Sequence, residues 1–148
     1  MAIKCNMNEA EFNKHFDSKV EELNKKILTA FIYAGNDFVT ACRNQPADHS
    51  LGFYLNDTNN LRNSIGYYIY QWGEEAKAVE HGTASDNRQL VSSVVSKQGF
   101  QLIGVAGMNY ASYVEAKGYN VLTIQKNAFF VKIKEYLKEV KKWADGKE

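Results

Sequence analysis

The sequence predicts an α+β fold, in which a long N-terminal helix and a C-terminal helix pack on a small antiparallel β-sheet. Apolar stripes with spacings of three and four residues, over Phe12–Cys42 and over 124–143, each mark one face of a helix. Between them, residues 65–72 are rich in aromatic and β-branched side chains, which favour strands. We expect a single domain over residues 1–148, because a chain of this length hides roughly 70% of its unfolded surface.

The first helix is expected to run from about Asn8 to Asn44. Asn8 with Glu11 three residues later gives a capping start, and Pro46 stops the helix. Its length is on the order of 55 Å at 1.5 Å per residue, and Gly35 is its weak point. A helix this long cannot bury its whole length against a small domain, so we expect part of it to protrude or to pack on a neighbouring subunit.

The sheet and the short helices are expected within about 51–122. Residues 65–72 form the first strand and are apolar or aromatic on both faces. Gly73-Glu74-Glu75 offers a turn, after which 76–81 return as an antiparallel partner. A third strand is expected at 100–106, and we expect the helices to pack on one face of the sheet.

The segment before the third strand has two interpretations. Residues 90–95 fit a short amphipathic helix behind a Ser85 or Asp86 cap. Their β-branched content leaves a strand as the alternative. Within and after the third strand, Gly104 and Gly107 indicate close approach of another part of the protein to the backbone.

The last part of the chain is expected to hold three elements. Residues 110–117 indicate a short helix ended by Gly118, and 119–122 indicate a short strand. Thr123 is the expected cap of the final helix, at about 124–144. Lysines surround its apolar stripe, and those in its last two turns suit the negative end of the helix dipole.

Composition argues against several classes of protein. The 18 Lys and Arg residues nearly balance the 17 Asp and Glu residues, so no global field attracts nucleic acid or anionic lipid. Cys5 and Cys42 show no CxxC spacing and no secretory signal accompanies them, so free thiols in a reducing cytoplasm are expected. The longest uncharged stretch, 28–36, is far shorter than the ~20 apolar residues that span a bilayer. We expect a soluble chain with no membrane partner.

Catalytic and metal-binding interpretations find little support in the sequence. His15, His49 and His81 are too scattered to indicate a metal site. Cys42 lies on the apolar stripe of the first helix, where a small buried hydrophobe is a better interpretation than a nucleophile. P-loop, GxSxG and GxGxxG patterns are missing. The sequence therefore predicts no enzyme, no metal and no cofactor.

Two short segments about fifty residues apart carry the most specific pattern, and both adjoin expected strands. In the first, Asp57 or Thr58 is placed to cap one helical turn whose Leu61 points into the core. Glu115 in the second is a candidate partner of Arg62, because a bidentate carboxylate–guanidinium pair fixes the geometry between distant segments. The alternative is two separate surface charges. The segments read Asp57-Thr58-Asn59-Asn60-Leu61-Arg62-Asn63-Ser64-Ile65 and Tyr110-Ala111-Ser112-Tyr113-Val114-Glu115-Ala116-Lys117-Gly118.

In this order, the two segments resemble the family of bacteriophage tail-completion and head-tail joining proteins, small minor tail components of long-tailed phages. That family shows an acidic residue, Thr, usually Gly, then Leu-Arg and a Ser-Ile step into a strand. A later strand leads into Tyr-Ala and Tyr-Val-Glu. Here Asn59 replaces the glycine, and Ala116-Lys117 follows Glu115 where the family commonly has Gly-Thr. The residues that match the motif are Asp57, Thr58, Leu61, Arg62, Tyr110, Tyr113 and Glu115.

The resemblance covers roughly residues 27–142 and implies a non-enzymatic virion assembly protein. It would be a head-tail connector or tail-completion ring subunit whose partners are the phage connector and tail-tube proteins. Its expected location is the host cytoplasm during assembly and then the virion neck or tail. The alternatives are a small binding module of unknown ligand, including nucleic acid, and an unrecognised enzyme. The basic C-terminal helix permits the nucleic-acid alternative, although a solvated helix face explains the same lysines.

Overall fold

The computed structural model has an α+β fold of five helices and three strands over its described residues. The elements are α1 (Glu9–Arg43), α2 (Asn60–Asn63), β1 (Ile65–Gln71), β2 (Glu74–Val79), α3 (Ala84–Val94), β3 (Phe100–Ala106), α4 (Ala111–Ala116) and α5 (Thr123–Ala144). The described residues are 1–4, 6, 8–46, 48, 52, 60–80, 84–107, 111–117 and 121–146.

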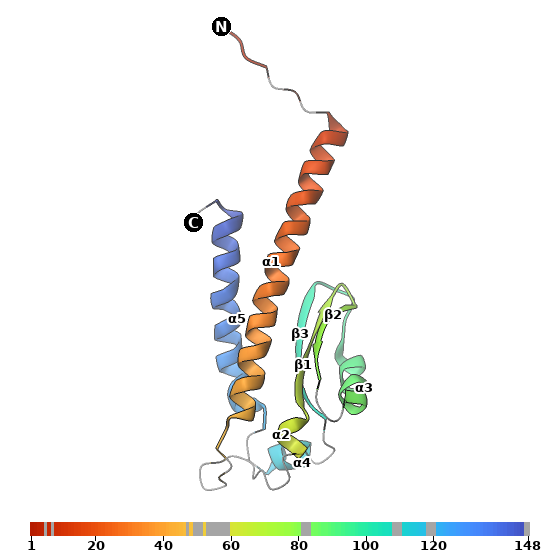
Figure 1. The fold of residues 1–148 in the computed structure, drawn as a ribbon, viewed down its shortest axis with the longest axis vertical. Helices are drawn as coiled ribbons and strands as arrows, with labels where there is room; N and C mark the ends of the chain where they lie inside the picture. Colours follow the sequence, from red (N-terminus) through yellow and green to blue (C-terminus); the bar gives the residue numbers. More distant parts are fainter. Residues whose placement is uncertain are drawn as a thin grey trace.

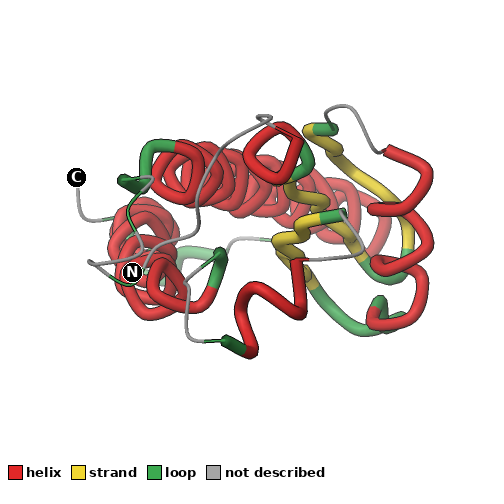
Figure 2. Tube along the Cα trace, turned by 90° about the horizontal axis from the view of Figure 1, so that it is seen from below, coloured by secondary structure: helices red, strands yellow, loops and turns green. Residues whose placement is uncertain are grey.

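Helices cover both faces of the sheet. Helix α1 lies between α5 and the sheet, and α5 runs antiparallel to α1 (Figure 1). Helix α3 lies on the opposite face, as the view from below also shows (Figure 2). The prediction of helices on one face only was therefore wrong. The reason is that β1 is buried on both sides over Ile65–Ile69 and needs cover on each.

Helix α1 confirms the predicted long N-terminal helix. The side-chain oxygen of Asn8 accepts the backbone N–H of Glu11 at 2.8 Å, and the helix ends at Arg43, shortly before Pro46. Its buried residues all lie in its second half, at Ala30 and beyond. The first turns extend past the sheet and past the end of α5 (Figure 1). Part of the helix therefore protrudes, as expected from its length.

The three strands form an antiparallel sheet in the order β2-β1-β3. Tyr68 of β1 pairs with Ala78 of β2 on one side and with Ile103 of β3 on the other. The hairpin turn is made by Trp72 and Gly73, which have φ angles of 54° and 86°. Positive φ at both central residues is typical of a two-residue hairpin, so β2 starts at Glu74, earlier than the predicted 76.

Two apolar clusters hold these layers together. On the α1 side, Ile65, Tyr67 and Ile69 pack with a set of residues from α1, α2, α4 and the start of α5. On the α3 side, Tyr68 packs with Val91 and Val105. Residues 90–94 belong to α3, so the helical interpretation of this segment is confirmed over the strand alternative. The larger cluster contains Phe31, Phe38, Val39, Cys42, Leu61, Ala111 and Val121 besides the three β1 residues.

Charged side chains tie α3 to the sheet on its outer face. Arg88 of α3 reaches Glu75 and Glu80 at 2.7 Å each, and its guanidinium lies 5.5 Å from the centre of the Tyr68 ring. The Tyr68 hydroxyl donates to Glu80 at 2.5 Å. Burial, followed by this hydrogen bond, raises the pKa of Tyr68 well above its usual range. Tyr68 thus stays a neutral donor, and the network is structural.

Two glycines allow aromatic rings to approach the backbone. A Cβ on Gly35 of α1 would lie 2.7 Å from the ring of Tyr67, whose hydroxyl donates to Asn36 at 2.8 Å. A Cβ on Gly104 of β3 would lie 2.3 Å from the ring of Phe38. The close approach predicted at Gly104 is confirmed. Gly35, which sequence alone marks as a weak point of the helix, is where Tyr67 packs.

We expect Gly35→Ala to destabilise the protein by about 1–2 kcal/mol. Alanine gains about 1 kcal/mol of helix propensity, but overpacking against a buried ring typically costs about 1–3 kcal/mol. Urea unfolding at equilibrium measures the difference. In a Tyr67→Val background the same change should be neutral or stabilising, because no ring meets the new methyl group. A stabilising effect in the wild-type background would contradict the packing role.

Candidate functional site

The two motif segments meet at one end of the sheet, where α2, α4 and the start of α5 lie (Figure 1). Leu61 of α2 is buried in the main cluster with 4% of its surface exposed, as predicted. Arg62 and Glu115 are half-buried. The other motif residues, Asp57, Thr58 and Tyr110, lie outside the described residues, and so does the side chain of Tyr113.

Glu115 of α4 caps the N-terminus of α5. One carboxylate oxygen accepts the backbone N–H groups of Val121 and Leu122, at 2.8 and 3.0 Å. The other accepts the backbone N–H of Thr123 at 3.0 Å. The first N–H groups of a helix have no partner within it, and the helix dipole favours a negative charge there. Glu115 therefore fixes the point at which α5 begins.

These contacts correct two predictions about the start of α5. Thr123 was expected to cap the helix, but Leu122 occupies the cap position without a side-chain cap bond, and Thr123 is the first helical residue. A strand was expected over 119–122, but the chain bends at Val121 and Leu122, the two of these residues that the structure describes. Their N–H groups turn toward Glu115 and are not available to a strand ladder.

No ion pair joins Arg62 to Glu115 in the described part of the chain, so the predicted pairing was wrong. The carboxylate already accepts three backbone N–H groups at a helix N-terminus, and they replace a guanidinium as its partners. The Nε atom of Arg62 is buried and has no hydrogen-bond partner among the described residues. The two motif segments are therefore joined through the core, in which Leu61 and Ala111 both take part.

Burial alone would raise the pKa of Glu115. Hydrogen bonds from the Thr123 side chain and from the backbone N–H groups of Leu122, Val121 and Thr123 outweigh it, and the pKa is lowered. Each of these bonds is strongest with the charged carboxylate. Glu115 is therefore an ionised capping group, held in place by its donors.

Two polar residues at the end of α1, Arg43 and Gln45, also contact this end of the sheet, and the sequence did not identify them. We call the meeting point of α1, α4 and α5 the junction. The buried Gln45 amide donates to the carbonyls of Cys42 and Val121, at 3.0 and 2.8 Å. Arg43 donates to the carbonyl of Ile65 at 2.5 Å. The only local signal was a polar residue directly before Pro46, which is common in loops. Gln45 ties the end of α1 to the start of α5.

Cys42 lies within this junction but is a packing residue. It is fully buried in the main cluster, as the sequence predicted. Burial, with a smaller contribution from the charge of Glu115, raises the pKa of its thiol to about 12. A thiol of this kind is protonated at neutral pH and shielded from solvent, so it is a poor nucleophile.

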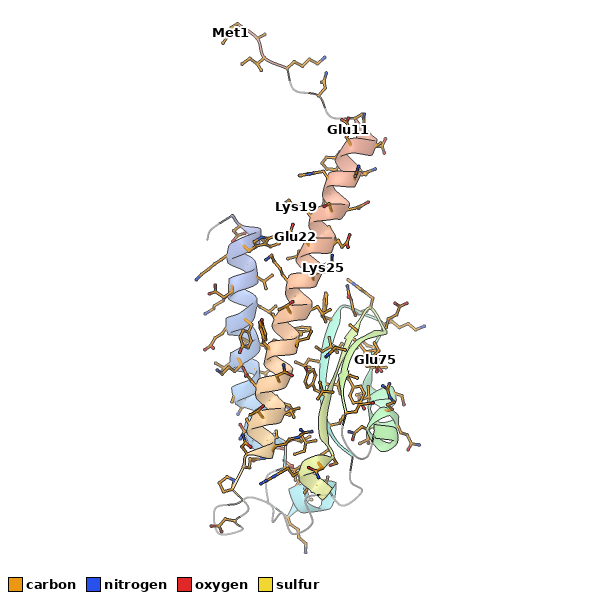
Figure 3. All side chains as sticks on the ribbon, viewed as in Figure 1. Met1, Glu11, Lys19, Glu22, Lys25 and Glu75 are labelled. Carbon is orange, nitrogen blue, oxygen red and sulfur yellow. The ribbon has the colours of Figure 1, made fainter. Side chains whose placement is uncertain are left out.

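A second candidate surface is the α1 tip, which we define as Glu9–Glu22. Phe12 and Phe16 stack with their ring centres 6.2 Å apart, and each has 56% of its surface exposed; Val20 has 38%. The tip projects beyond the sheet, with Glu11, Lys19 and Glu22 along it (Figure 3). A groove joins it to the end of α5; its lining residues are Phe16, Lys19, Val20, Leu23, Trp143, Ala144 and Gly146.

No protein-family model, curated protein or solved structure matches this chain. Within the described residues, no group of three or more His, Cys, Asp or Glu side chains is placed to hold a metal ion. Among the described helices, none has the length and apolar character needed to cross a membrane.

We expect Glu115→Gln to lower stability by about 1–2 kcal/mol at pH 7, because the variant loses the charged cap. A lowered pKa means that the stabilisation is present above the unfolded-state value of about 4.3 and is lost as pH falls through the folded-state pKa. The two proteins should therefore converge in acid. Urea unfolding from pH 7 to pH 3 measures this, with Glu135→Gln on the exposed face of α5 as control. A difference that does not depend on pH would contradict the capping role.

Proposed function

We propose that the protein is a non-enzymatic virion assembly protein of a bacteriophage or a resident prophage. In this proposal it is a subunit of a head-tail connector or tail-completion ring. Its partners are the phage connector and tail-tube proteins, and it passes from the host cytoplasm into the virion neck or tail. The observation that carries the proposal is the α1 tip, an exposed apolar surface on a helix that extends beyond the sheet and beyond α5.

The exposure of the tip favours a role in assembly. Fully burying a side chain such as Phe or Val contributes about 1.5–3 kcal/mol, so Phe12, Phe16 and Val20 leave favourable free energy unused in the isolated chain. Neighbouring exposed apolar residues mark interaction sites more often than single ones do. A helix of this shape has a direct use in a ring, where it reaches across to an adjacent subunit.

The motif segments support the same proposal through their local structure. Leu61 lies in a short helix directly before β1, and α4 with Glu115 follows β3, which is the order that the resembling family's motifs require. In this chain Glu115 is a structural cap. Because Glu115 holds α4 against the start of α5, the motif stabilises the fold. We therefore place the binding function on the exposed surfaces of the protein.

The first test is assembly. We expect a monomer or weak oligomer at micromolar concentration, which becomes a ring when the connector or tail-tube protein of the same phage is added. Analytical ultracentrifugation with and without those proteins measures this. The Phe12→Ser and Phe16→Ser double variant should lose the ring while keeping the monomer fold, because both side chains are exposed. A stable closed dimer that ignores both partners would count against the ring.

The second candidate function is nucleic-acid binding, which the exposed lysines of α5 favour. Lys126, Lys134, Lys138 and Lys142 follow each other at intervals of four or eight residues, and all four are exposed. With a net charge of +1, we expect only weak, salt-sensitive binding without sequence preference. Fluorescence anisotropy with duplex and single-stranded DNA measures it. Nanomolar affinity at physiological salt would place this function above assembly.

A further inference from the structure

The α1 tip is acidic as well as apolar. Its carboxylates outnumber its lysines by five to two: Glu9, Glu11, Asp17, Glu21 and Glu22 against Lys14 and Lys19. Glu21 and Glu22 have lysine partners within the helix, at 3.2 and 3.8 Å. Over the described residues no ion pair involves the other three carboxylates. Glu9 and Asp17 lie three residues before Phe12 and Val20, so they border the apolar stripe.

The exposed side chains of α5 have the opposite net charge. Helix α5 carries six lysines and two glutamates. Four of the lysines and Phe130 follow one another at intervals of four residues, in a row that winds about 40° around the helix at each step. We call it the lysine row: Lys126, Phe130, Lys134, Lys138 and Lys142, all exposed. Phe130 is 48% exposed. It borders a groove whose other lining residues are Phe38, Gly104, Leu122, Thr123, Lys126 and Phe129.

We propose that the α1 tip of one copy docks on the lysine row of α5 in a second copy. Phe12 and Phe16 would occupy the groove beside Phe130, while Glu9 and Asp17 would face the lysines. The charged residues match in spacing, since Glu9 and Asp17 lie eight residues apart along α1, about 12 Å, and Lys126 and Lys134 lie equally far apart along α5. This contact rests on the proposed function, because a ring subunit is expected to bind a second copy of the same chain.

Charge selects this pairing over a symmetric one. Two α1 tips would bring the same excess of carboxylates together, and two lysine rows would bring like cations together. Pairing of tip with row joins opposite charges and apolar side chains at once. A contact between two different surfaces of one chain is heterologous, and it produces a ring when its rotation closes. The same geometry is the one that a neck ring needs.

Charge exchange tests the contact. Sedimentation velocity on the wild-type protein, from about 10 µM to about 1 mM at low salt, should show association that grows with concentration and weakens as salt is added. Glu9→Lys with Asp17→Lys should reduce the apparent association constant at least about tenfold, and so should Lys126→Glu with Lys134→Glu. The chain with all four changes should recover association, because its charges are complementary again while its net charge is that of the wild type.

The matched control is Lys77→Glu with Lys97→Glu, which changes the net charge equally on exposed residues near the sheet and should leave association unaltered. The proposal is overturned if the wild type stays monomeric throughout, or if the four-substitution chain associates no better than either double variant. Circular dichroism confirms that each variant is folded. The sedimentation experiment needs no phage component, so a negative result there rejects only the head-to-tail contact. A negative result with the connector or tail-tube protein rejects the ring function.

Discussion

The burial of β1 on both of its faces is the constraint on which the rest of the structure depends. Ile65, Tyr67 and Ile69 require apolar cover on one side and Tyr68 requires it on the other, so the strand takes the centre of the sheet. Helix α1 provides the first cover and α3 the second. Since Tyr67 fits only where α1 has no side chain, Gly35 sets the position of the helix along the strand. That position leaves the first turns of α1 beyond the sheet.

The polar junction at the other end of the sheet determines the second helix layer. Gln45 links the end of α1 to Val121, and Glu115 holds the first N–H groups of α5. These hydrogen bonds place the start of α5 beside the end of α1, and α5 then packs along α1 in the antiparallel direction. Helix α5 has only 22 residues against the 35 of α1, so it ends before it reaches the level at which α1 begins. The uncovered α1 tip is therefore a direct result of where α5 begins.

The proposed assembly function and the head-to-tail contact both follow from this inequality of helix lengths. The exposed aromatic rings of the tip would gain burial free energy only when a partner covers them, and the surrounding carboxylates keep the free tip hydrated. Positive charge on α5 gives the tip a complementary surface on the same chain. In this proposal the chain associates where a partner gathers many copies.

The sequence by itself determined the elements whose pattern is local. Spacings of three and four residues located α1 and α5, Asn8 and Glu11 marked the first cap, and the aromatic run and the 100–106 segment located β1 and β3. The sequence also indicated that Leu61 and Cys42 are buried. Only the tertiary structure decided the partner of Glu115, the role of Gly35 and the cover on both faces of the sheet. These depend on contacts between distant segments: the backbone N–H groups at the start of α5 that donate to Glu115, and the Tyr67 ring of β1 that packs on α1. Periodicity reports which face of an element is apolar, but not which distant group will meet it.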